Sequence, residues 1–203
     1  MAEHEECSAN RTLSFQSLKN LDYGHSCFEA RGLSRETLEH FGVGYCSKGI
    51  HAGRIAIPIH NLDGALVAYV GCSLEDGTYT YPNGFRVDWE VYNLHRVQEQ
   101  WSPSDGVLVV RDFFDVFRLY ESGYPNAIAL MVDTITEAQI RLLAGAFGEG
   151  ADLTLFGERQ SDWALDLTKR LIRLFRLRIL WASQDDIRPQ YLSTEAIGEI
   201  LNQ

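Results

Sequence analysis

The stretch VLVVRDFFDVFRLYES, residues 107–122, decides the fold of this chain. Its first four residues, Val107-Leu108-Val109-Val110, are apolar without interruption, which is typical of a strand buried on both faces. From Phe114 to Ser122 the residues are typical of a helix, and Gly123 ends it. A buried strand that runs directly into a helix indicates the beginning of a β–α–β unit.

The same alternation continues to the C-terminus. The predicted strands are 107–110, 127–131, 153–156 and 179–181, and the predicted helices are 114–122, 136–147, 161–175 and 193–201. This order predicts a mostly parallel, Rossmann-like α/β domain over residues 105–203. Ligands of such sheets bind beyond the carboxyl ends of the strands, so the loops after the four strands are the places to look for chemistry.

A different pattern precedes residue 105. Ser34 predicts the N-cap of a short helix that ends at Gly42. Residues 54–72 have the pattern of a hairpin with an Asn-Leu-Asp-Gly turn, and the glycine- and tyrosine-rich stretch 77–84 favours a surface loop with aromatic anchors. We expect an α+β subdomain over residues 13–104, preceded by a flexible polar tail over residues 1–12.

Composition narrows the class of protein. The chain has 203 residues, 45% of them hydrophobic, and no apolar run approaches the roughly 20 residues that span a bilayer. The acidic N-terminus lacks the apolar core of a secretion signal, so we expect a cytoplasmic protein without a membrane partner. A net charge of −10 weighs against strong binding of phosphate backbones unless the few basic residues cluster. The four cysteines are scattered, so no zinc site is expected.

The loops after the strands carry few carboxylates. The first begins with a cation, Arg111, before Asp112 and Asp115, and the third offers Glu158 beside Arg159. Mg²⁺ sites for phosphoryl chemistry need several oxygen ligands on one centre. This pattern does not predict such a centre in its usual form.

Several segments resemble, in order and in spacing, the catalytic core of bacterial replicative DNA primases. They are RGLSRETLEHFGVGY (31–45), GRIAIPI (53–59), YNLHR (92–96), VLVVRDFFDV (107–116), and ALM (129–131) with TITEAQIRLL (134–143). The resemblance extends from about residue 18 to about residue 192. It implies an α+β N-terminal subdomain followed by a TOPRIM-like α/β domain, and a metal-dependent nucleotidyltransferase as the ancestral activity.

The departures from this family fall where its function lies. The resemblance implies a glutamate and a glycine at Arg111 and Asp112, and an Asp-x-Asp pair at Gly157 and Arg159, around Glu158. The glutamate position now carries the opposite charge, and both aspartates of the implied metal site are absent. We therefore expect a degenerate site.

Basic residues of the family are replaced as well. Cys72 lies where the resemblance implies an arginine, and Thr78 or Thr80 where it implies a lysine. The matching positions that survive are Arg54, Asp115 and, more loosely, Asp186. The zinc ribbon and the helicase-binding domain of the family have no counterpart in this sequence.

The predicted helix 161–175 has an apolar stripe opposite a basic face. The basic face comprises Lys169, Arg173 and Arg176, with Arg170 nearby. Such a face is either a solvated surface or a docking strip for nucleic acid or an acidic partner, and both alternatives stay open. Arg54 is a further candidate contact.

Three functional hypotheses follow. The first is a pseudoenzyme that acts by binding single-stranded DNA or a replication or primase protein, without nucleotidyl transfer and without a cofactor. The second is an active metal-dependent nucleotidyl or phosphodiester enzyme whose relocated site holds Mg²⁺ or Mn²⁺ through Asp112, Asp115, Glu158 and Asp186. The third is an acidic protein-interaction module. The sequence leaves the oligomeric state open.

Overall fold

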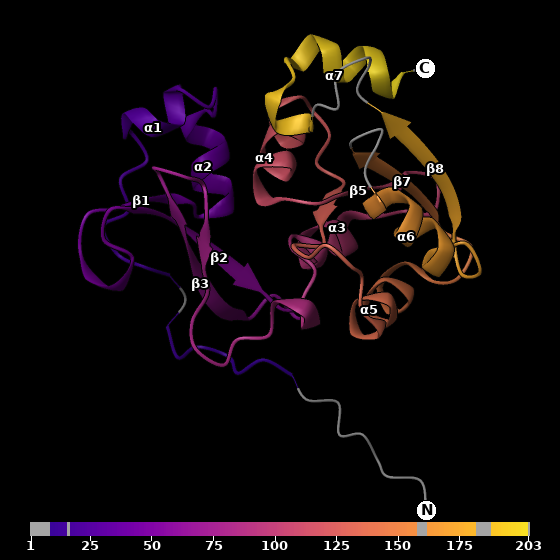
Figure 1. The fold of residues 1–203 in the computed structure, drawn as a ribbon, viewed down its shortest axis with the longest axis horizontal. Helices are drawn as coiled ribbons and strands as arrows, with labels where there is room; N and C mark the ends of the chain where they lie inside the picture. The colour runs from indigo at the N-terminus through magenta and orange to yellow at the C-terminus, as the bar shows by residue number, and fades with distance from the viewer. Residues whose placement is uncertain (1–8, 16, 158–161, 182–187, 203) are drawn as a thin grey trace, which may run out of the picture.

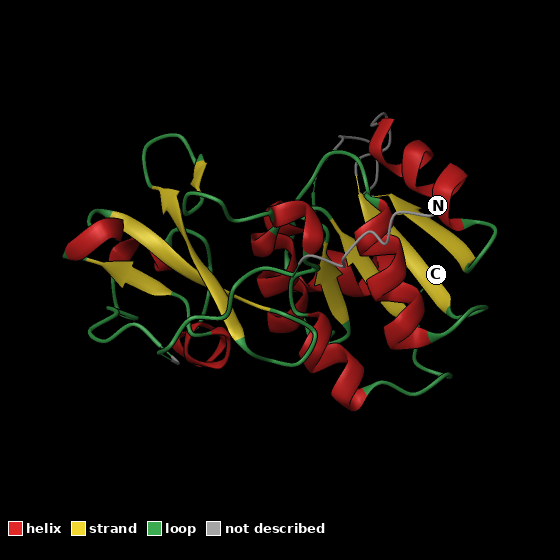
Figure 2. Cartoon of the chain, turned by 90° about the horizontal axis from the view of Figure 1, so that it is seen from below, coloured by secondary structure: helices red, strands yellow, loops and turns green. Residues whose placement is uncertain are grey.

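The protein contains two four-stranded sheets joined through helices (Figure 1; Figure 2). The structure, a computed structural model, describes residues 9–15, 17–157, 162–181 and 188–202. An antiparallel sheet is followed by a parallel one, which confirms the predicted α+β subdomain and TOPRIM-like α/β fold. None of the described helices is long and apolar enough to cross a membrane.

The first sheet has the order β1-β2-β3-β4. Its strands are β1 (Gly44–Cys46), β2 (Arg54–His60), β3 (Leu66–Ser73) and β4 (Tyr79–Thr80). The antiparallel pairing of β2 with β3 confirms the hairpin. The helices beside this sheet are α1 (Ser26–Glu29) and α2 (Arg35–Phe41). The Ser34 hydroxyl accepts the Thr37 N–H at 3.2 Å, and Gly42 ends α2 at a left-handed φ of 66°, as predicted.

The second sheet is parallel, in the order β6-β5-β7-β8. Its strands are β5 (Val107–Val110), β6 (Ala127–Ala129), β7 (Asp152–Gly157) and β8 (Arg176–Trp181). The helices are α3 (Leu94–Gln100), α4 (Phe113–Glu121), α5 (Glu137–Phe147), α6 (Asp162–Leu171) and α7 (Thr194–Leu201), with three 3₁₀ turns, Gly49–His51, Val87–Trp89 and Pro189–Tyr191.

Strand β5 is buried on both faces, as its sequence predicts. Val107 and Val109 belong to a cluster with residues of α5 and α6, whereas Leu108 and Val110 belong to a cluster with α4 and α7. The second cluster also contains Ile55, Ile57 and Ile59 of the first sheet. The two sheets therefore share one hydrophobic core around α4. The boundary at residues 104–105 stays a prediction.

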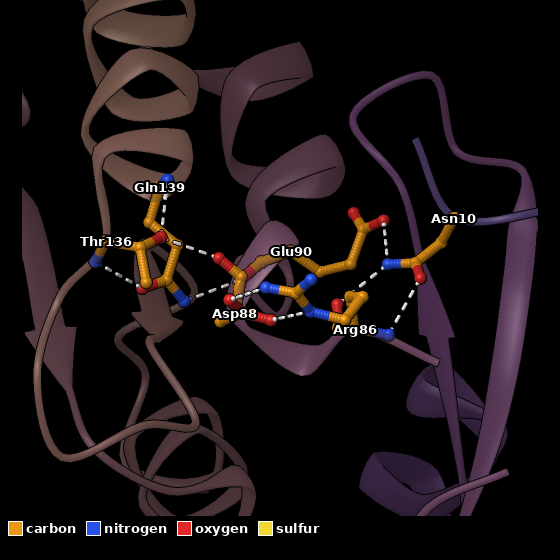
Figure 3. Close-up of polar contacts among 6 residues, drawn as sticks. All are labelled: Asn10, Arg86, Asp88, Glu90, Thr136 and Gln139. Atoms are coloured by element: carbon orange, nitrogen blue, oxygen red, sulfur yellow. Dashed lines mark hydrogen bonds and ion pairs between the residues drawn. The ribbon is translucent and has the colours of Figure 1, made fainter. Parts of the chain in front are cut away.

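A polar network fixes the segment between the sheets (Figure 3). The buried Gln139 side chain donates to the carbonyl of Glu90 at 2.8 Å, and the Thr136 hydroxyl donates to the carbonyl of Asp88 at 2.6 Å. Asn10, within the segment expected to be a flexible tail, donates to the Arg86 carbonyl at 2.8 Å and to the Glu90 carboxylate at 2.9 Å. The segment 86–90 is thereby tied to α5 and to the N-terminal residues.

Two predictions need correction. Helix α6 ends at Leu171 instead of 175, so Arg173 lies in the following turn and Arg176 begins β8. The predicted basic face of one helix is therefore wrong. The stretch 77–84 is also not simply a surface loop, because Tyr79 and Thr80 form β4 and pair with β3.

Candidate functional site at the end of the first parallel strand

The carboxylates after β5 form the N-terminal cap of α4. Asp112 is the N-cap, and its Oδ1 accepts the N–H of Phe114 at 3.0 Å. The Oδ2 of Asp115 accepts the N–H of Asp112 at 3.2 Å, which completes a capping box. The local sequence therefore positions both acids through the start of the helix.

Asp115 is committed to backbone hydrogen bonds. Its second oxygen accepts the N–H of Gln190 at 3.0 Å, and the residue is 1% exposed. Burial raises the pKa of Asp115 to about 7, the charge of Asp112 adds to the rise, and Arg188 opposes it. The geometry of Asp115 is thus that of a residue that caps α4.

Asp112 joins three segments of the chain. The hydroxyl of Tyr79, on β4, donates to its two carboxylate oxygens at 2.8 and 3.0 Å. An Nη1 of Arg188 lies 3.7 Å from its Oδ2. Burial, and then the charge of Asp112, hold the pKa of Tyr79 well above its ordinary value, so the phenol is the donor. Sequence reasoning missed both partners, because neither Tyr79 nor Arg188 belongs to a recognisable motif.

Arg111 is neutralised by the neighbouring loop. It forms an ion pair with Asp133, which follows β6, the strand beside β5 in the sheet. The N–H of Met131 also donates to the carbonyl of Arg111 at 3.0 Å and brings the two loops together. The loops that follow β5 and β6 thus meet at the carboxyl ends of their strands, and a cation occupies the position of the glutamate that the resemblance implies.

Gly157 is covered by an aromatic ring. A Cβ atom at this position would lie 3.1 and 3.3 Å from two ring carbons of Trp163, which is itself 5% exposed. An aspartate there would have to displace the indole. The other predicted members of this loop, Glu158 and Arg159, lie outside the described residues, as does Asp186.

A cleft of about 790 Å³ opens beside Asp112, between the first sheet and α4. Its charged lining residues are Glu29, Arg31, Asp76, Asp112, Arg118 and Arg188. Arg118 donates to the carbonyl of Gly32 at 3.2 Å, and Arg31 lies over the Phe114 ring at 5.2 Å. The cleft therefore presents three guanidinium groups, although the whole chain is acidic.

Of two further residues singled out in the sequence, Cys72 lines the cleft and Arg54 does not. Burial raises the pKa of the Cys72 thiol to about 11, so the thiol is neutral at physiological pH. Arg54 lies on β2. A side chain at Gly71 would meet the stem of Arg54 at 2.9 Å, so this glycine makes room for the arginine.

The predicted basic contacts are partly neutralised. Arg170 pairs with Asp166 at 3.1 Å and Arg176 with Asp152 at 2.6 Å. Lys169 and Arg173 are exposed. Within the described ranges, no group of three or more His, Cys, Asp or Glu residues is placed to hold a metal ion.

Comparison with known proteins agrees with this architecture. No family model matches the chain. It is 26% identical over 151 residues to a DNA primase of Legionella pneumophila, covering 56% of this chain and 26% of that protein. It is 28% identical over 153 residues to a DNA primase of Helicobacter pylori, covering 66% of this chain and 27% of that protein. The chain thus spans about a quarter of the length of these relatives.

Solved structures show the same fold. The Escherichia coli primase catalytic core matches with a TM-score of 0.68 and 20% identity, over 89% of this chain and 72% of that one. A DnaG primase catalytic domain bound to single-stranded DNA matches with a TM-score of 0.69 and 19% identity, over 89% of this chain and 71% of that one. In fold, this chain matches the catalytic core of bacterial DNA primases, and in sequence it is similar to bacterial DNA primases.

Proposed function

We propose that this chain is a primase-like core that has lost nucleotidyl transfer and acts by binding single-stranded DNA, as part of a replication or primase assembly. The observation that carries the proposal is the ion pair of Arg111 with Asp133 at the end of β5. Phosphoryl transfer needs metal ions and cations fixed in advance around the developing negative charge. A salt bridge in this position means that protein side chains balance each other's charge where the family's site would hold metal ions. It therefore supports the loss of nucleotidyl transfer.

The surrounding acids support the same reading. Asp112 is held by Tyr79 and by the N–H of Phe114, and both oxygens of Asp115 accept backbone N–H groups. Turning either acid away from these donors and toward a metal ion would leave buried donors without partners, at a cost of about 1 to 3 kcal/mol each. Two residues of the relocated metal site, Glu158 and Asp186, lie outside the described residues, and the contacts of the other two support the binding function that we propose.

The cleft supplies the binding surface of this proposal. Arg31, Arg118 and Arg188 line it. One solved relative is a primase catalytic domain bound to single-stranded DNA, and we extend that ligand to this chain as a proposal. With three cations, the affinity should vary with salt with a logarithmic slope of only about −2.

Primer synthesis tests the loss of activity. The pure chain is incubated with single-stranded template, nucleoside triphosphates and Mg²⁺ or Mn²⁺, and we expect no templated product. A metal-dependent, templated product would refute the proposal.

DNA binding is tested separately, by fluorescence anisotropy with a labelled single strand. Arg31→Glu and Arg188→Glu should weaken binding, because they reverse charges in the cleft. Arg35→Glu is the matched control, because Arg35 lies exposed on α2, pairs with Glu39 at 2.7 Å and does not line the cleft. Equal loss in all three variants would show that the cleft is not the binding surface.

A further inference from the structure

The parallel sheet has one covered edge and one open edge. At β6, Tyr92 forms a bridge with Ala129, with hydrogen bonds of 2.8 and 3.2 Å between their backbones. At the other edge lies β8, whose only strand partner among the described residues is β7. It is the outermost strand on the right of Figure 1. Unpaired strand edges are templates for the addition of another strand.

The backbone groups that face outward can be identified. The N–H of Arg176 donates to the carbonyl of Ala151 at 3.0 Å, so the backbone of Arg176 faces β7. Successive residues of a strand direct their hydrogen-bonding groups to alternate sides. The N–H and C=O groups of Leu177, Ile179 and Trp181 therefore face away from the sheet.

The segment that leads into β8, together with the start of the strand, is basic in an acidic protein. Five of the 18 Lys and Arg residues fall within residues 169–178, KRLIRLFRLR, and no acid does. Arg170 and Arg176 are paired, but the ion pairs of the described part of the chain do not include Lys169, Arg173 or Arg178, all of which are exposed. This local charge opposes the overall charge of −10 and favours an acidic ligand.

We propose that an extended acidic peptide of a partner protein adds to the outer edge of β8 as a fifth strand. Arg178 lies on one face of β8, and the half-buried Leu177 and Ile179 lie on the other. A peptide that alternates acidic and apolar residues matches both faces, because cross-strand neighbours share a face. The edge offers backbone N–H donors and C=O acceptors in turn. Phosphate groups can pair with the cations and accept from N–H groups, but they cannot donate to the C=O groups. This favours a peptide over nucleic acid.

Peptide binding to purified full-length chain tests this inference, which does not depend on the proposed DNA binding. The probe is a fluorescent peptide that alternates Glu with Val, and its control carries Lys in place of Glu. We expect only the acidic peptide to bind, and salt to weaken it. Arg178→Glu should weaken it by roughly tenfold, because an attractive cross-strand pair becomes a repulsive one.

A backbone variant separates strand addition from simple charge attraction. Ile179→Pro removes one outward N–H and no hydrogen bond to β7, whereas Ile179→Ala removes a comparable side chain and keeps the N–H. The proline variant should lose binding while the alanine variant keeps it, with thermal unfolding checking that both are folded. If the proline variant does not fold, the same Glu–Val peptide N-methylated at alternate residues replaces it, and this peptide should not bind, because it cannot donate backbone hydrogen bonds to the edge.

Other occupants would overturn the proposal. Equal binding by the two Ile179 variants, or equal binding of the Lys peptide, would exclude strand addition by an acidic peptide. A single-stranded oligonucleotide that binds here instead, and is lost with Arg178→Glu, would assign the surface to nucleic acid. A concentration-dependent dimer that Ile179→Pro abolishes would assign the edge to a second copy of the chain.

Discussion

The hydroxyl of Tyr79, in the antiparallel sheet, donates a hydrogen bond of 2.8 Å to Oδ1 of Asp112, which lies 33 positions later and follows β5 of the parallel sheet. Asp112 also begins α4, the helix around which the two sheets share their core. The acid after β5 therefore ties the antiparallel sheet to the parallel one.

Removing this hydroxyl should destabilise the fold. Tyr79→Phe removes one of the donors to a partly buried carboxylate, and we expect the free energy of unfolding to fall by about 1 to 3 kcal/mol. Urea denaturation measures the change. Tyr81→Phe is the control, because Tyr81 is close by and its hydroxyl makes no hydrogen bond among the described residues. Equal losses in the two variants would show that the Tyr79–Asp112 bond does not stabilise the fold.

Stability should depend on pH through Asp115. Its pKa is about 7 in the folded chain, above the ordinary 3.8, so the unfolded chain loses this proton first as pH rises. The free energy of unfolding should therefore fall between the ordinary pKa and about pH 7, by up to about 4 kcal/mol, and stay level above it.

The measurement is the difference between the wild type and Asp115→Asn at each pH. A difference is needed because His60 and His95 act in the opposite direction. Burial lowers their pKa values to about 4 and about 3, so protonation of the unfolded chain destabilises the fold as pH falls below the ordinary value of 6.5. A difference that does not vary with pH would contradict the raised pKa of Asp115.

The ring of Trp163 should make Gly157 intolerant of a side chain. Gly157→Ala places a Cβ about 3 Å from the ring, and we expect a loss of about 1 to 3 kcal/mol from overpacking. Gly145→Ala, within α5, meets no atom within 4 Å and should stabilise the helix by roughly 0.5 to 1 kcal/mol. Thermal or urea unfolding compares the two, and opposite signs are the expected result.

Local patterns predicted most of the fold. The apolar run Val107–Val110 and the capping residue Ser34 each act on their own neighbours, so they could be recognised from the sequence alone. The end of α6 could not be predicted in this way. Phe175 continues the helical apolar stripe and is buried, yet it reaches the core from the chain beyond the helix, so the periodicity persists after Leu171.

The site was predictable only in part. The replacement of the implied glutamate by Arg111 follows from the order of residues along one strand. Its pairing with Asp133 depends on two neighbouring strands ending at the same edge, and only the parallel topology places them there. Tyr79 comes from a two-residue strand, too short to produce a pattern.

Restoring the glutamate should not restore the enzyme. Arg111→Glu removes the ion pair with Asp133. The new glutamate, Asp112 and Asp133 then place three carboxylates around the end of β5. The pair is exposed, so we expect the free energy of unfolding to change by about 1 kcal/mol or less. Gly157 still lies under Trp163, and Asp112 still caps α4, so the carboxylate ligands that the resemblance implies after β7 are still missing.

Calorimetric titration of Arg111→Glu with Mg²⁺ should show no binding tighter than millimolar, and primer synthesis should stay absent. Asp133→Asn serves as the control, because it breaks the same ion pair without adding a carboxylate. Templated synthesis by Arg111→Glu alone would mean that one substitution had silenced an otherwise intact site, and that the remaining carboxylates can hold the metal after all.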